Sequence, residues 1–80
     1  MSSRRGEVAR AFGVVLKDAR RERGISQETL VEHADLDRTY PSLLERGLRQ
    51  PTLTYLFTIA DALGMEPSEL VRLVRTRLRS

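Results

Sequence analysis

Residues 26–51, SQETLVEHADLDRTYPSLLERGLRQP, contain the start and stop signals of two short helices in succession. Ser26 is placed to accept a hydrogen bond from a free amide in the first turn of one helix, which is expected to end near Ala34. Asp37 is a second capping residue, and Gly47 ends the helix that follows it. Because so few residues separate the two helices, a tight corner between them is expected.

Apolar residues recur at three- and four-residue spacing in three further segments, which predicts three more helices. Gly24 ends the first of these segments. Thr52 caps the second, and Gly64 ends it. Pro67 opens the third, which is expected to run over about residues 67–79 with a wide apolar stripe.

The length and composition are those of one small domain. The 80 residues include 14 Lys+Arg and 11 Asp+Glu but no Cys, so disulfides and cysteine-based zinc sites are excluded. No alternating strand pattern is present, no apolar stretch is long enough for a membrane span, and no signal peptide is recognised. The sequence therefore predicts an intracellular, all-α domain of five helices over residues 7–80, after a disordered tail over residues 1–6.

The same central stretch carries a recognisable pattern of residues. The pattern comprises Ser26-Gln27, Leu30, Leu36, Ser42, Leu44-Glu45-Arg46-Gly47 and Arg49-Gln50-Pro51-Thr52. It resembles the Cro and phage-repressor type of helix-turn-helix DNA-binding domain, the XRE family, and the likeness extends over most of the chain. The resemblance implies a lambda-repressor-like fold and a bacterial transcriptional regulator that binds double-stranded DNA in a sequence-specific way.

The resemblance and the helix geometry together indicate how DNA would be contacted. A short helix beginning after Asp37 is sized for the major groove, where Arg can bind guanine O6 and N7 and hydroxyls can reach several base edges. The expected base contacts are Arg38, Thr39, Tyr40 and Ser42. The expected phosphate contacts, which the family implies, are Gln27, Arg46, Arg49 and Thr52.

The resemblance also implies one ion pair, between Arg20 and Glu45, which is assigned to the architecture of the fold. Pro41 departs from the family pattern, because its ring removes a main-chain hydrogen bond and disfavours helical geometry at Tyr40. The helix is expected to span residues 38–46 if Asp37 caps it, or to begin only near Pro41.

One domain of this size contacts only about four to six base pairs, too few to specify a genomic site. A homodimer on a near-palindromic operator is therefore expected. The predicted dimer surface is the last helix with neighbours from the fourth, and it comprises Leu70, Leu73, Val74, Leu56 and Tyr55. At a promoter the dimer would either block RNA polymerase or recruit it.

Two alternatives remain beside a general regulator. Asp37-Arg38-Thr39-Tyr40 also resembles the sequence at this place in controller proteins of restriction-modification operons. From a different class, the chain could be an antitoxin or another protein-interaction module that docks its last helix on a partner.

No residues point to enzymatic chemistry, a cofactor or a small-molecule substrate. His33 has no second His or Cys with which to bind a metal, and no membrane association is expected. The expected location is the cytoplasm, at the nucleoid through DNA binding.

Overall fold

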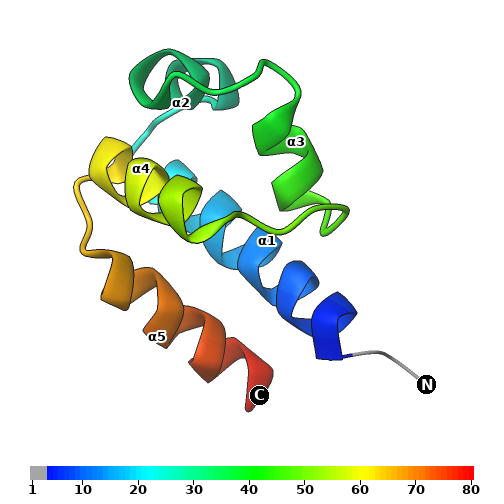
Figure 1. The fold of residues 1–80 in the computed structure, drawn as a ribbon. Coiled ribbons are helices and arrows are strands. Elements are labelled where there is room, and N and C mark those ends of the chain that lie inside the picture. Colours follow the sequence, from blue (N-terminus) through cyan, green and yellow to red (C-terminus); the bar gives the residue numbers. More distant parts are fainter. Residues whose placement is uncertain (1–3) are drawn as a thin grey trace.

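Five helices make up residues 4–80, the part of the chain that the computed structural model describes (Figure 1). They are α1 (Arg4–Glu22), α2 (Gln27–Ala34), α3 (Tyr40–Glu45), α4 (Leu53–Leu63) and α5 (Pro67–Leu78). The long helix α1 packs against α3 and α5, while α2 packs against α3 and α4. The prediction of an all-α fold of five helices is confirmed.

Local capping explains where α2 and α4 begin. The Ser26 hydroxyl accepts a hydrogen bond from the Thr29 amide at 3.0 Å, and the Thr52 hydroxyl accepts one from the Tyr55 amide at 3.1 Å. Each cap satisfies an amide that has no partner inside its own helix. Asp35 ends α2 in the left-handed region, with φ of 52°, a conformation that Asp adopts more readily than most residues.

Two glycines allow α3 and the segment after it to lie directly on α1. A Cβ on Gly13 would lie 2.5 Å from the Leu44 carbonyl oxygen, so only glycine permits this approach of the two helices. Gly47 has φ of +73°, and a Cβ there would lie 2.9 Å from the Arg10 side chain. The backbone of α3 is therefore held against the N-terminal half of α1.

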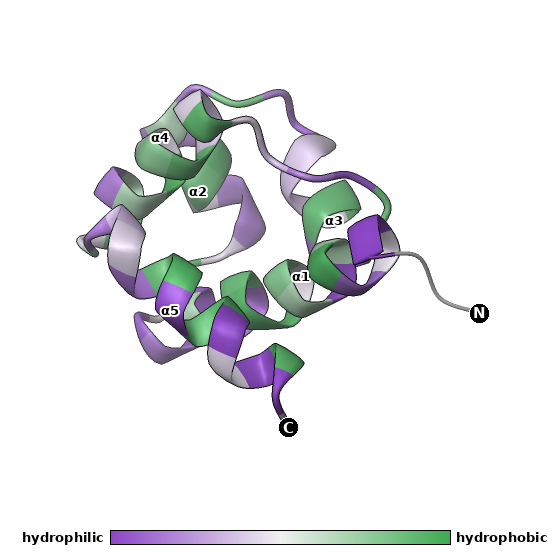
Figure 2. Cartoon of the chain, turned by 60° about the horizontal axis from the view of Figure 1, so that its bottom comes forward, coloured by the Kyte–Doolittle hydropathy of each residue, from purple (hydrophilic) through white to green (hydrophobic). Residues whose placement is uncertain are grey.

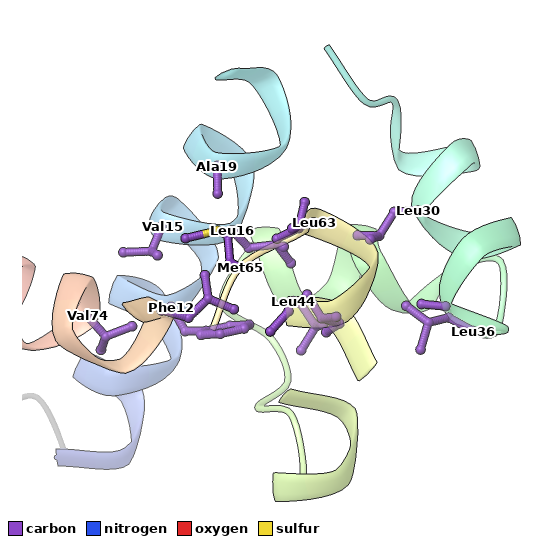
Figure 3. Close-up of a cluster of buried hydrophobic side chains, with 14 of the residues drawn as sticks. Phe12, Val15, Leu16, Ala19, Leu30, Leu36, Leu44, Leu63, Met65 and Val74 are labelled. Carbon is purple, nitrogen blue, oxygen red and sulfur yellow. The ribbon is translucent and has the colours of Figure 1, made fainter. Parts of the chain in front are cut away.

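The core is a single cluster of buried apolar side chains to which all five helices contribute. Figure 3 shows members from each helix pointing into a common interior, among them Phe12, Leu30, Leu44, Leu63 and Val74. The largest fully buried side chains are Leu16, Leu30, Leu44, Ile59, Leu70 and Pro41. None of the helices in residues 4–80 combines the length and hydrophobicity needed to cross a membrane.

The beginning of α1 differs from the expectation of a disordered tail over residues 1–6. The helix already starts at Arg4, while residues 1–3 lie outside the described residues. The Arg5 carbonyl oxygen accepts a hydrogen bond from the Gln50 side chain at 3.3 Å, and Ala9 is buried. The early start of α1 therefore involves contacts with the segment after α3. Such contacts between distant segments leave no sign in the spacing of apolar residues along α1.

Candidate nucleic-acid interface

The predicted recognition helix, α3, is shorter than residues 38–46, and the later of the two expected starts is correct. It begins at Tyr40 and ends at Glu45, and Pro41 occupies its first turn with its ring fully buried. Proline fits there because its missing N–H would have had no partner within the helix. Arg38 and Thr39 therefore form the turn that leads into α3 instead of its first helical residues.

Asp37 shapes this turn but does not cap a helix. Its Oδ1 accepts hydrogen bonds from the Thr39 amide at 2.9 Å and from the Thr39 hydroxyl at 2.7 Å. These two hydrogen bonds lower the pKa of the exposed Asp37 carboxyl, since they favour its charged form. Asp37 thus binds the amide and hydroxyl hydrogens of Thr39, and the Thr39 hydroxyl oxygen can still accept a hydrogen bond.

The four predicted base contacts lie within five consecutive residues that span the turn before α3 and its first turn. Arg38 and Thr39 are exposed, whereas Tyr40 and Ser42 are half-buried. The ion pairs found within residues 4–80 are Arg20–Glu45 and Arg23–Glu22, and neither involves Arg38. Arg38 lines a small hollow beside α2, together with Glu28 and Glu32. Its guanidinium is thus presented beside the corner between the two helices, where a ligand can reach it.

A hydrogen-bonded network ties the start of α2 to the end of α3. Arg20 Nε lies 2.7 Å from Glu45 Oε2 and its Nη2 lies 3.0 Å from Oε1, while Nη1 donates to the Ile25 carbonyl oxygen at 2.8 Å. The side chains of Arg20 and Glu45 are only 11% and 4% exposed. The hydrogen bond with Glu45 raises the pKa of Arg20, against the opposing effect of its burial.

Gln27 belongs to the same network. Its amide Nε2 donates to Glu45 Oε1 at 3.0 Å, which fixes the side chain at the first position of α2. One N–H of this amide remains for an outside acceptor. The predicted ion pair is therefore present, and it positions one of the predicted phosphate contacts.

The other predicted phosphate contacts occupy the segment between α3 and α4. Arg46, Arg49 and Thr52 are all exposed there. The Thr52 hydroxyl accepts from the Tyr55 amide, which leaves its own hydrogen free to be donated. The two arginines and this hydroxyl give the segment the donors and the positive charge that phosphate oxygens require.

The predicted dimer surface needs correction at two residues, Leu70 and Val74. Leu70 is 0% exposed and Val74 is buried, so both side chains belong to the core of one chain and offer no surface to a second. Tyr55 packs its ring against Tyr40, with 5.0 Å between the ring centroids. Leu56 and Leu73 are half-buried. The sequence predicts an apolar stripe along α5, but it does not show which residues of this stripe pack into the core of one chain.

A different set of apolar residues reaches the surface on α4 and α5, and Figure 2 shows hydrophobic residues along both helices. Leu53 is 71% exposed, Phe57 is 53% exposed and Val71 is 52% exposed. Leu56 and Val71 line one apolar hollow between the two helices. We call Leu53, Leu56, Phe57 and Val71 the α4–α5 patch. Exposed apolar side chains gathered on neighbouring helices are a feature of interaction surfaces.

The comparisons with known proteins agree with this geometry. The Helix-turn-helix family model matches residues 16–70. Control protein C.MunI from a Mycoplasma species is 45% identical over 60 residues, which cover 74% of this chain and 81% of that protein. The solved structure of the restriction-modification controller protein C.AhdI from Aeromonas hydrophila is 42% identical with a TM-score of 0.75, covering 78% of this chain and 94% of that one.

A further solved structure contains DNA. It is the tetramer of the restriction-modification controller protein C.Esp1396I in complex with its natural 35 base-pair operator, and it is 29% identical with a TM-score of 0.82. The likeness covers 91% of this chain and 96% of that one.

Proposed function

Because the chain belongs to the helix-turn-helix (XRE) family of DNA-binding transcriptional regulators, which are not enzymes, we propose that it binds a near-palindromic operator as a homodimer. In this proposal the turn before α3 and the first turn of α3 enter the major groove. Arg38, Thr39, Tyr40 and Ser42 contact base edges there. Such binding would place the protein at the nucleoid in the cytoplasm.

The observation that carries the proposal is the exposed pair Arg38 and Thr39 at the corner between α2 and α3. A guanidinium without an ion-pair partner can bind guanine O6 and N7 through two parallel hydrogen bonds, which discriminate against other bases by about 1–3 kcal/mol. Phosphate contacts would fix the position of the protein along the duplex but would not discriminate between base sequences. In this proposal they come from Gln27, Arg46, Arg49 and Thr52.

A homodimer follows from the small number of bases that one α3 can contact. Two copies related by a two-fold axis read two half-sites, so the operator is expected to be an inverted repeat with half-sites about one helical turn apart. The α4–α5 patch supplies an apolar surface on which two copies can associate. Protein concentration would then control occupancy, since dimerisation and DNA binding are linked by mass action.

Selection from a random duplex pool tests the proposal, because the pool contains every short operator sequence. The enriched duplexes are expected to share an inverted repeat. Titration of the best duplex at about 150 mM salt is expected to give a cooperative isotherm, with affinity 1000-fold or more above that for a scrambled duplex, on the order typical of specific regulators. Equal and weak binding to both duplexes would contradict sequence-specific recognition.

A narrower function is favoured by the relatives, of which C.MunI, C.AhdI and C.Esp1396I are named as control or controller proteins. We propose that this chain is likewise the controller protein of a restriction-modification operon and acts on that operon's promoter. The neighbouring genes would then encode an endonuclease and a methyltransferase. A promoter fusion would show activation at low protein dose, through recruitment of RNA polymerase, and repression at high dose. Neighbouring genes of unrelated function would contradict the controller proposal and leave only the proposal of a general regulator.

A further inference from the structure

The two tyrosines of the chain meet between the recognition helix and α4. Tyr40 is the first residue of α3, and Tyr55 lies in the first turn of α4. Their ring centroids are 5.0 Å apart and the ring planes are inclined by 50°, which is a favourable geometry for an aromatic pair. The contact thus joins the residue that follows Arg38 and Thr39 to a helix distant from it in sequence.

Tyr55 is itself held firmly in place. Its main-chain amide donates to the Thr52 hydroxyl, which fixes the backbone at the start of α4, and the residue remains 40% exposed. Residues two apart on a helix lie on nearly opposite faces, so Tyr55 points away from Leu53 and Phe57. It therefore lies toward α3 and outside the α4–α5 patch.

Besides this ring contact, the start of α3 is held by hydrogen bonds from Thr39 and Tyr40 to Asp37, which is itself exposed. The helix has six residues, and at its N-cap the Thr39 hydroxyl donates to Asp37 instead of accepting from a helical amide. The buried Pro41 ring fixes one side of the first turn, and Tyr40 packs partly against the core. Tyr55 covers the Tyr40 ring from the side of α4. The position of the residues before Tyr40 thus depends on a ring held between the core and Tyr55.

The surroundings of the Tyr40 hydroxyl agree with this enclosure. Burial raises the pKa of Tyr40 and the neighbouring Tyr55 adds to the increase, whereas Arg49 opposes it. The phenol is therefore half-buried beside the Tyr55 ring, with Arg49 within electrostatic reach.

We propose that Tyr55 is a positioning residue for base recognition: by packing on Tyr40 it fixes the turn that carries Arg38 and Thr39, and it contacts no base itself. The inference rests on the proposed function, since the turn must read bases for its position to matter. It adds a residue on α4 to the determinants of operator specificity, although α4 does not enter the groove.

The first experiment separates positioning from direct DNA contact. Tyr55→Phe keeps the ring and is expected to retain the wild-type ratio of affinities for the selected operator and a scrambled duplex. Tyr55→Ala is expected to lower operator affinity by about 2- to 10-fold, the range of an aromatic-pair contribution, with scrambled-duplex affinity unchanged. Equal losses on both duplexes would instead make Tyr55 a backbone contact and overturn the proposal. Val15→Ala, a core change on α1 beside Met65 and Leu73 of the α5 side, controls for reduced stability.

A double-mutant cycle tests whether Tyr55 acts through Tyr40. If it does, Tyr55→Ala has no further effect on the affinity ratio in a Tyr40→Ala background. Additive losses would contradict the proposed route. If the wild type prefers the selected operator and Tyr55→Ala prefers it equally, only the positioning role is contradicted. If the wild type itself prefers no sequence, the proposed function is contradicted.

A third measurement requires no DNA. In both Tyr55→Phe and Tyr55→Ala the only remaining tyrosine is Tyr40, and the chain has no Trp, so tyrosinate absorbance follows a single group. Because the neighbouring ring excludes water, the pKa of Tyr40 is expected to be higher in the Phe variant than in the Ala variant. Identical titrations would show that the Tyr55 ring does not cover Tyr40 in solution, which would overturn the proposal.

Discussion

In the proposed function Arg38 is the residue expected to contribute most to base reading, and its exposed position allows a test without loss of folding. The side chain is exposed and belongs to neither ion pair found within residues 4–80. Arg38→Ala is expected to remove about 1–3 kcal/mol of preference for the selected operator while leaving the thermal midpoint nearly unchanged. Binding isotherms on selected and scrambled duplexes measure the first quantity. Equal losses on both would assign Arg38 to phosphate.

Asp37 gives the same turn a dependence on pH. Its carboxylate accepts two hydrogen bonds from Thr39, which lower its pKa below the ordinary value. A carboxyl with a lowered folded-state pKa contributes stability above its unfolded pKa, and this contribution is lost as pH falls through the folded pKa. The Thr39 amide resonance is therefore expected to titrate with a midpoint below that of a free Asp, in the region under about pH 4. In Asp37→Asn this titration should be absent, and its persistence would assign the change to another group.

The contact between α1 and α3 depends on the absence of one side chain. A Cβ at Gly13 would lie 2.5 Å from the Leu44 carbonyl oxygen and 2.7 Å from that of Glu45, both of them main-chain atoms that cannot rotate away. Gly13→Ala is expected to cost about 1–3 kcal/mol, as overpacking does, and to weaken operator binding because α3 is displaced. Denaturant unfolding and DNA titration measure the two effects.

Gly24→Ala provides the comparison for Gly13→Ala. A Cβ at Gly24 would meet nothing within 4 Å, so the cost there comes only from the positive φ of 66°. This variant is expected to lose stability while retaining operator affinity under folding conditions. A Gly13→Ala variant that also retained full affinity would contradict the dependence of α3 on this close approach.

Helices that depend on local chemistry could be predicted from the sequence, and positions that depend on distant contacts could not. Ser26 and Thr52 cap α2 and α4 as predicted, because a cap is decided by neighbouring residues. The apolar stripe on α5 predicts that one face of this helix is buried, but not whether it packs on the same chain or on a second one. The prediction of Leu70 and Val74 as dimer contacts is wrong, because both side chains lie in the core of one chain. The Tyr40–Tyr55 contact leaves no local signal, since the two residues come from different helices.

The proposed association of two chains involves the whole molecule. A charged residue in the α4–α5 patch is expected to prevent it. Phe57→Glu is expected to give a folded monomer that binds the operator without cooperativity, because a charge would be buried in an apolar interface. Leu48→Glu is the matched control for sedimentation alone, since Leu48 is 58% exposed, close to the 53% of Phe57, and lies outside the patch. It is not used for the DNA titration, because Leu48 lies between Arg46 and Arg49. Sedimentation measures both variants. A Phe57→Glu chain that remains dimeric would move the interface elsewhere.

In the proposed dimer, the number of arginines that meet phosphates predicts how salt changes DNA affinity. Each arginine that neutralises a phosphate contributes about 0.9 to the slope of log affinity against log salt concentration, and a dimer carries two copies of each. Arg49→Ala is therefore expected to reduce the slope by about two while weakening the selected and scrambled duplexes alike. Arg77→Ala removes an equal charge from the exposed side of α5, where no DNA contact is proposed, and should leave the slope unchanged. A reduced slope for Arg77→Ala would show that the DNA also reaches α5, because counterion release depends on which charges meet phosphates and not on net charge.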